Sequence, residues 1–99
     1  MFGSDMMARL AEMKRVAEES KNRLENIIVE GESGGGLIVV AMNGNRVVKS
    51  VKVNTDIKSM DNEDLEDLLC VAFQRVMDKV NTLNEREVMA STKNLFPGM

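Results

Sequence analysis

The 99-residue sequence contains no histidine, tryptophan or tyrosine, and it has only one cysteine, one proline and three phenylalanines. The lack of histidine removes the commonest general base and metal ligand. The lone Cys70 can form neither an internal disulfide nor a thiolate zinc site. Because Cys70 falls among apolar neighbours in a predicted helix, we expect it to be buried or half-buried rather than nucleophilic. We therefore predict a protein that is not an enzyme and that uses no metal, cofactor or small-molecule substrate.

Long hydrophobic runs are also absent. No apolar stretch approaches the ~18 residues that a membrane span needs, and the N-terminus lacks the basic start and apolar core of a secretion signal. These absences predict a cytoplasmic protein without a membrane partner.

The net charge of −3 argues against a nucleic-acid partner when the chain is taken as a whole. The charge is unevenly distributed, however. Residues 1–54 carry eight Lys or Arg against seven Asp or Glu, whereas residues 55–99 carry five against nine. Much of the acidity lies in residues 61–67, where a helix is expected to begin, and a helix N-terminus favours negative charge. The nine methionines predict mainly core filling and helix formation, with a sticky binding surface as the alternative.

Three short apolar runs occupy the middle of the chain, at residues 27–29, 37–42 and 46–54. Glycine-bearing turns separate them, and the Asn43-Gly44 pair is typical of a tight hairpin turn. The pattern predicts a three-stranded antiparallel meander. Alternation in the third run places Val47, Val51 and Val53 on one face and Val48, Ser50 and Lys52 on the other, and it predicts a bulge or a more exposed position at Lys49.

Helical patterns flank the meander on both sides. Residues 5–26 carry an apolar seam at alternating spacings of four and three, made of Met6, Leu10, Met13, Ala17, Ser20, Leu24 and Ile27. This seam is narrow, so we expect the first helix to pack along only part of its length and to project beyond it. A broader stripe runs from Leu65 to Leu83 and predicts a second helix that lies across the sheet.

The sequence thus predicts an α+β fold in a single domain spanning residues 1–99. Its order is an N-terminal helix, a three-stranded antiparallel β-meander, a long second helix packed on the sheet and a polar C-terminal tail. We expect residues 1–4 and about 91–99 to be mobile. Because a three-stranded sheet leaves two faces and two edges bare, we expect the flanking segments to cover part of its surface.

Several motifs in this order resemble the YbaB/EbfC family of bacterial nucleoid-associated, DNA-binding proteins. They are the opening Met1-Phe2-Gly3, the turn at residues 31–37, the Asn43-Gly44 turn, Val51-Lys52-Val53, the acidic lead-in at residues 63–68, Ala72-Phe73 and Met89-Ala90-Ser91. The resemblance implies a homodimer with a joint core of sheets and second helices, from which the first helices project as arms. It also implies binding to duplex DNA with little sequence preference, and a location in the bacterial cytoplasm and nucleoid.

The resemblance further implies a set of basic side chains that contact phosphates, which position a protein on DNA without reading its sequence. These residues are Arg9, Lys14, Arg15, Lys21, Arg23, Arg86 and Lys93. We expect the core and the dimer interface to include Leu37, Val39, Val51, Val53, Leu69, Phe73 and Val76. The alternative hypothesis is a protein-interaction adaptor that uses the Met-rich first helix and binds DNA weakly or not at all.

Overall fold

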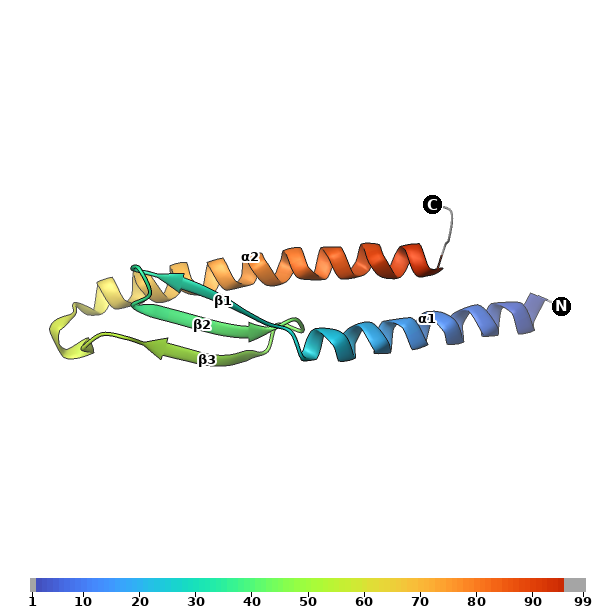
Figure 1. Cartoon of the computed structure of the whole chain (residues 1–99), viewed down its shortest axis with the longest axis horizontal. Helices are drawn as coiled ribbons and strands as arrows, with labels where there is room; N and C mark the ends of the chain where they lie inside the picture. Colours follow the sequence, from blue (N-terminus) through green and yellow to red (C-terminus); the bar gives the residue numbers. More distant parts are fainter. Residues whose placement is uncertain (1, 96–99) are drawn as a thin grey trace.

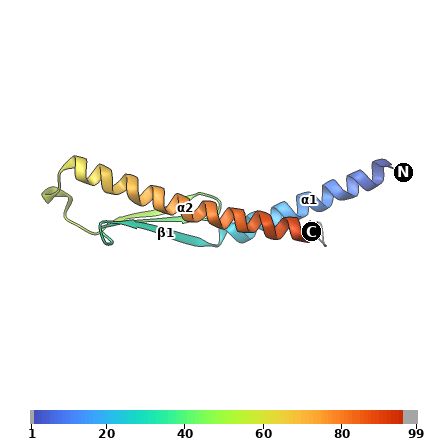
Figure 2. The ribbon, with the colours of Figure 1, turned by 90° about the horizontal axis from the view of Figure 1, so that it is seen from above.

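The computed structural model describes residues 2–95 and has the predicted α+β order of helix, three antiparallel strands and long helix (Figure 1). The elements are α1 (Phe2–Glu25), β1 (Ile28–Ser33), β2 (Ile38–Asn43), β3 (Val48–Val53), the short 3-10 helix η1 (Ile57–Ser59) and α2 (Asn62–Leu95). The molecule is long and narrow, about 70 × 21 × 19 Å. Both helices extend beyond the same end of the sheet (Figure 1), and their axes cross at an angle in the view of Figure 2.

The sheet has the strand order β1-β2-β3, as a meander requires. In the β2–β3 ladder, Ala41 pairs with Ser50 and Met42 pairs with Val48, so Lys49 is the extra residue of a bulge. The predicted irregularity at Lys49 is confirmed. The bulge shifts the side-chain alternation, and the assignment of Val48 to the face opposite Val51 was therefore wrong.

The turn between β2 and β3 differs in detail from a two-residue Asn-Gly hairpin. Its positive φ falls on Arg46, at 65°, while the Asn43 carboxamide oxygen accepts hydrogen bonds from the backbone N–H groups of Asn45 and Val47. Gly44 instead holds the end of α1, since its N–H donates to the carbonyls of Leu24 and Ile27 at 2.9 and 3.0 Å. A Cβ at Gly44 would lie 2.7 Å from the Leu24 oxygen, so only glycine allows this approach.

The core lies between α2 and the first two strands. Buried side chains from the helix meet buried side chains from β2; the cluster comprises Ala72, Val76, Val80, Ile38, Val40 and Met42. On β1, Gly31 permits close packing, because a Cβ there would lie 2.3 Å from the backbone nitrogen of Val76. Helix α2 packs on β1 and β2 and leaves β3 largely uncovered. Val51 and Val53, which share the α2 side of the sheet with Val40 and Ile38, consequently remain 42% and 41% exposed.

Of the seven residues expected in the core and dimer interface, Val76 is fully buried in the single chain. Leu37, Val39 and Leu69 are half-buried, and Phe73 is exposed together with Val51 and Val53. Cys70 is also exposed, contrary to expectation. It lies about 160° around α2 from Ala72, at 100° per residue, and so points away from the core.

Both helices are longer than predicted. Helix α1 begins at Phe2 rather than at residue 5. Helix α2 continues to Leu95, so the polar tail expected from Ser91 onward is helical over residues 91–95. No glycine or proline interrupts residues 62–95. The helix propensity of these residues therefore allows α2 to continue through its last turns. The rest of the predicted tail, residues 96–99, lies outside the described residues.

Helix α1 packs along only part of its length, as its narrow seam predicted. Leu24 is buried near the sheet, and Val16, which the predicted seam omitted, is the other buried residue among positions 3–25. Nearer the N-terminus, Met6, Leu10 and Met13 are 50–64% exposed. The arm therefore has a supported base and an unsupported outer half. Within residues 2–95, neither helix has the length and apolarity needed to cross a membrane.

Candidate nucleic-acid interface

The predicted basic residues of α1 are exposed, but two of the five are already engaged. Arg15 lies between Glu12 and Glu19, donating to both carboxylates from one turn on either side, with Nη1 2.5 Å from Glu19 Oε1. These hydrogen bonds raise the pKa of Arg15 and lower the pKa of Glu12. The positive charge of Arg15 is thus largely balanced within the helix.

Arg23 bonds to α2 rather than pointing freely into solvent. Its Nε and Nη2 atoms lie 3.1 and 2.5 Å from Glu87 Oε1. The hydrogen bond from Arg23 lowers the pKa of Glu87, partial burial opposes this shift, and Ser20 adds a weaker lowering. This pair fixes the base of the arm against α2, so Arg23 has a structural role that sequence spacing did not indicate.

The remaining α1 cations are Arg9, Lys14 and Lys21. None of them forms an ion pair with another side chain of the part that the structure describes. The whole of α1 nevertheless carries five Lys or Arg and five Asp or Glu, giving a net charge of zero. Positive charge on the arm is therefore confined to the surroundings of these three side chains, and the arm as a whole is neutral.

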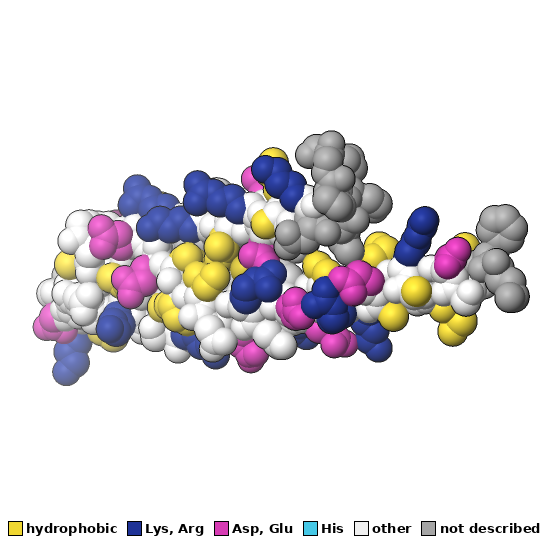
Figure 3. Space-filling view, turned by 45° about the vertical axis from the view of Figure 1, so that its right-hand side comes forward, with side chains coloured by type: hydrophobic (Ala, Val, Ile, Leu, Met, Phe, Trp, Pro, Cys, Tyr) yellow, Lys and Arg dark blue, Asp and Glu magenta, His cyan; other side chains and the backbone are white. Residues whose placement is uncertain are grey.

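Helix α2 distributes its charge differently. Its four cations are separated by four, seven and seven residues, which places them within about 40° of one another around the helix axis. This basic stripe comprises Arg75, Lys79, Arg86 and Lys93, all of them exposed. Figure 3 shows a row of Lys and Arg side chains along the upper edge of the molecule, whereas basic and acidic side chains are mixed over the arm. The sequence prediction included Arg86 and Lys93 but missed the other two, although the spacing was sufficient to reveal the stripe.

Two residues of the basic stripe are fixed against the sheet. Arg75 Nη1 donates to the backbone oxygen of Glu32 at 2.7 Å, and Lys79 Nζ donates to that of Glu30 at 2.6 Å. The two side chains satisfy carbonyl groups of β1, an edge strand, and so block its pairing with another chain. Their cationic ends are held at this edge of the sheet.

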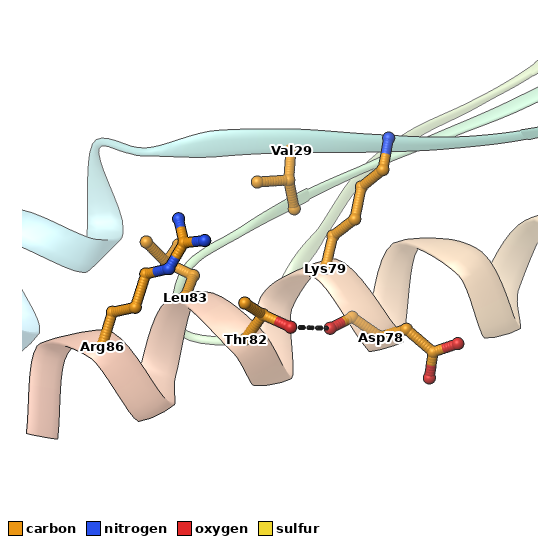
Figure 4. A pocket seen from close by; sticks show the side chains of 6 residues that line it. All are labelled: Val29, Asp78, Lys79, Thr82, Leu83 and Arg86. Carbon is orange, nitrogen blue, oxygen red and sulfur yellow. Dashed lines mark hydrogen bonds between the residues drawn. The ribbon is translucent and has the colours of Figure 1, made fainter.

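A shallow groove of about 410 Å³ continues along this edge between β1 and α2. Val29 and Leu83 form its apolar floor, and Lys79 and Arg86 rise from α2 on the same side (Figure 4). The Asp78 carboxylate points away from both cations in Figure 4, and it accepts a hydrogen bond from Gln74 at 2.9 Å. The Asp78 carboxylate therefore does not face the two positively charged side chains of the groove.

A second surface is apolar and lies on the other flank of α2. Because Arg75 and Lys79 mark the β1 side of the helix, Phe73 and Met77 project from the opposite flank, toward the uncovered side of β3. We call this surface the open face; it consists of Val48, Val51, Val53, Leu69, Phe73 and Met77. An exposed apolar patch of this kind is typical of a protein–protein interface.

Comparison with known proteins assigns the fold to a family. The model of the YbaB/EbfC DNA-binding family matches residues 2–95, which is nearly the whole chain. The chain belongs to this family. A nucleoid-associated protein of Flavobacterium johnsoniae is 33% identical over 95% of this chain and 88% of the relative, and one from Legionella pneumophila is 30% identical over 92% and 81%.

The fold of this YbaB/EbfC family member also matches a solved structure. The crystal structure of an uncharacterized protein from Helicobacter pylori superposes with a TM-score of 0.80 at 20% identity, covering 88% of this chain and 92% of the other. The resemblance seen in the motifs is thus confirmed at the level of family and fold. The family is one of DNA-binding proteins rather than enzymes. No group of three or more His, Cys, Asp or Glu within residues 2–95 is placed to hold a metal ion.

Proposed function

We propose that this protein is a homodimeric nucleoid-associated protein that binds duplex DNA mainly through phosphate contacts and with little sequence preference. The observation that carries the proposal is the match of residues 2–95 to a DNA-binding family whose named relatives are nucleoid-associated proteins. The proposed location is the bacterial cytoplasm and nucleoid, in nucleoid organisation or gene regulation.

Phosphate contact is the mode of binding that the exposed side chains favour. Arg9, Lys14 and Lys21 on α1, with Arg86 and Lys93 on α2, are exposed cations without an ion pair to another described residue. Arg15 and Arg23 remain in the proposed set, but each must leave or share a carboxylate partner to meet DNA. Lysine and arginine contacts to phosphates supply affinity without sequence information.

A homodimer is the proposed assembly because the open face has no cover in the single chain. Val51, Val53 and Phe73 are 42%, 41% and 36% exposed beside the core of the molecule. Burying such a surface against a second copy would complete a core that one small chain leaves partial. Because Arg75 and Lys79 block the edge of β1, we expect the second copy to bind on the β3 side of the sheet.

The second candidate is a protein-interaction adaptor, which the outer half of α1 favours. Met6, Met7, Leu10 and Met13 are 50–71% exposed there, and flexible methionine side chains suit adaptable protein surfaces. An adaptor would bind a protein through the arm and would bind DNA weakly or not at all.

The deciding experiment measures binding of the purified protein to a labelled, arbitrary duplex at about 50 to 200 mM salt. The slope of log K against log salt is about −0.9 for each phosphate contact. We expect tight binding at low salt and a steep slope. The variant Arg9→Gln, Lys14→Gln, Lys21→Gln should bind more weakly and with a shallower slope.

The matched control is Lys49→Gln, Lys52→Gln, Lys58→Gln, which removes the same charge from the sheet and its following loop. It should retain most of the binding, because the proposal places no phosphate contact there. Absence of DNA binding at low salt by a folded protein would reject the proposal and favour the adaptor. An equal loss in both variants would instead assign the effect to net charge and reject the arm as the contact surface.

A further inference from the structure

The basic stripe on α2 lies on a side of the molecule that the α1 arm does not share. Arg23 of α1 bonds to Glu87, and a groove between the helices is lined by Ala17, Ser20 and Lys21 from α1 and by Val88, Ser91 and Thr92 from α2. At 100° per residue, these α2 residues lie roughly 115° to 155° around the helix axis from the centre of the stripe. The stripe therefore lies on a different side of α2 from the surface that faces the arm.

Carboxylates are absent from the stripe itself. Between Leu68 and Leu95, helix α2 carries three acidic residues against the four cations of the stripe. Asp78 points away and bonds to Gln74, Glu87 bonds to Arg23, and Glu85 lines a separate hollow beside Arg46. The acidity of α2 is otherwise confined to its first turns. None of the four stripe cations forms an ion pair with another described residue, on a chain whose net charge is −3.

The stripe also has a length suited to a nucleic-acid backbone. Eighteen residues separate Arg75 from Lys93, which is about 27 Å along a helix. That distance corresponds to about eight base pairs at 3.4 Å per phosphate along one strand. The first two cations are held at the edge of β1 by their bonds to backbone oxygens, so part of the stripe is already ordered before any ligand arrives.

We propose that Arg75, Lys79, Arg86 and Lys93 form a second phosphate-binding surface for duplex DNA, on the outer side of α2 and separate from the α1 arm. This inference rests on the proposed DNA-binding function. It adds Arg75 and Lys79 as contact residues, and it gives each protomer two surfaces that face different directions. Such a protomer could contact two duplex segments at once.

The test uses positions that only this inference assigns. The variant Arg75→Gln, Lys79→Gln keeps hydrogen-bond donors near the β1 carbonyls but removes both charges. In the salt series, we expect at least a tenfold loss of affinity at low salt. The slope should become shallower by about 1.8 if one stripe of a dimer is engaged, and by about 3.6 if both are.

Two further variants separate charge from structure. Lys49→Gln, Lys58→Gln removes the same charge elsewhere and should bind as the wild type does. Arg75→Lys, Lys79→Arg keeps the charge while changing the bonds to β1, and it should retain binding. Circular dichroism and the unfolding midpoint, measured at equal protein concentration, check that each variant is folded.

The outcomes distinguish this inference from the function on which it rests. If the wild type binds DNA and Arg75→Gln, Lys79→Gln binds with the same affinity and salt slope, the stripe is not a contact surface, although the DNA-binding function stands. If the swapped variant loses binding as severely as the Gln variant, bonding to β1 rather than charge is responsible, and the inference is rejected. If the wild type does not bind DNA, both proposals are rejected.

Discussion

Gly31 sets the distance between the sheet and α2. A Cβ at this position would lie 2.3 Å from the nitrogen and 2.8 Å from the Cα of Val76, which are backbone atoms of a helix and cannot turn aside. Nothing in a strand pattern distinguishes this glycine from the turn glycines that follow it at residues 34–36. Its importance comes from what faces it across the core.

We predict that Gly31→Ala lowers the free energy of unfolding by about 2–3 kcal/mol, because the added methyl forces α2 away from β1. The measurement is urea unfolding followed by circular dichroism at fixed protein concentration. Gly3→Ala is the matched control: its Cβ meets nothing within 4 Å, and alanine is the better helix former. A Gly31→Ala protein as stable as the control would show that α2 is not closely packed on β1.

Neighbouring residues of one helix can also differ sharply in what they offer a ligand. Lys14 forms no ion pair within the described chain, whereas Arg15 is held between two carboxylates. Both are exposed basic residues, and the sequence prediction gave them the same role. Ion pairs on an exposed helix surface are weak, so Arg15 can exchange its carboxylates for phosphates, but with less electrostatic gain than Lys14.

At the scale of the element, α1 has two halves with different support. Val16 and Leu24 are buried at its base, and Gly44 and Glu87 bind it there, whereas Met6 to Met13 has no buried side chain. A helix is marginally stable where no tertiary contact supports it. Helix α1 should therefore open from its outer end without disturbing the rest of the fold.

Amide hydrogen exchange tests this expectation. Backbone amides of residues 6–13 should exchange much faster than those of residues 17–25 and approach the rate of a fraying helix end, since local opening requires little free energy there. The core strand β2 provides the slow reference within the same sample. Equal protection along the whole of α1 would show that something covers the outer half in solution, which would support a protein partner or a second copy at the arm.

At the scale of the whole molecule, the apolar and basic surfaces lie on opposite flanks of α2. The open face adjoins β3, while Arg75 and Lys79 cap the carbonyl groups of β1. One flank is thus suited to self-association and the other to an anionic ligand. The separation would allow the protein to dimerise without covering its basic stripe.

The proposed dimer gives a prediction at this scale. Val51→Glu should shift the protein toward monomer, because it places a charge in the apolar interface. Val71→Glu is the control, since Val71 is equally exposed, 41% against 42%, but projects from α2 away from the open face. Light scattering during size-exclusion chromatography gives the mass of each. A monomeric wild type, or dissociation by Val71→Glu but not by Val51→Glu, would contradict dimerisation through the open face.

The order of the helices and strands was predictable from local sequence patterns. Period-two and helical apolar patterns identified the strands and helices, and the glycine-bearing turns separated them. The position of Lys49 on the expected apolar face of its strand predicted a bulge or a more exposed position there. Motifs spread along the chain carried the resemblance to the family. The end of α2 was misplaced because a polar composition from Ser91 onward was taken for a tail, although no residue up to 95 breaks a helix.

The spacing of the four α2 cations is likewise a property of the sequence, and it determines that they share one side of the helix. Only the tertiary structure decided which side faces the sheet, that Arg23 meets Glu87 across 64 residues, and that α2 leaves β3 uncovered. Periodicity states which residues lie together on an element, but it does not state what packs against them. Those outcomes depend on contacts between residues distant in the chain, which exist only once the elements have assembled.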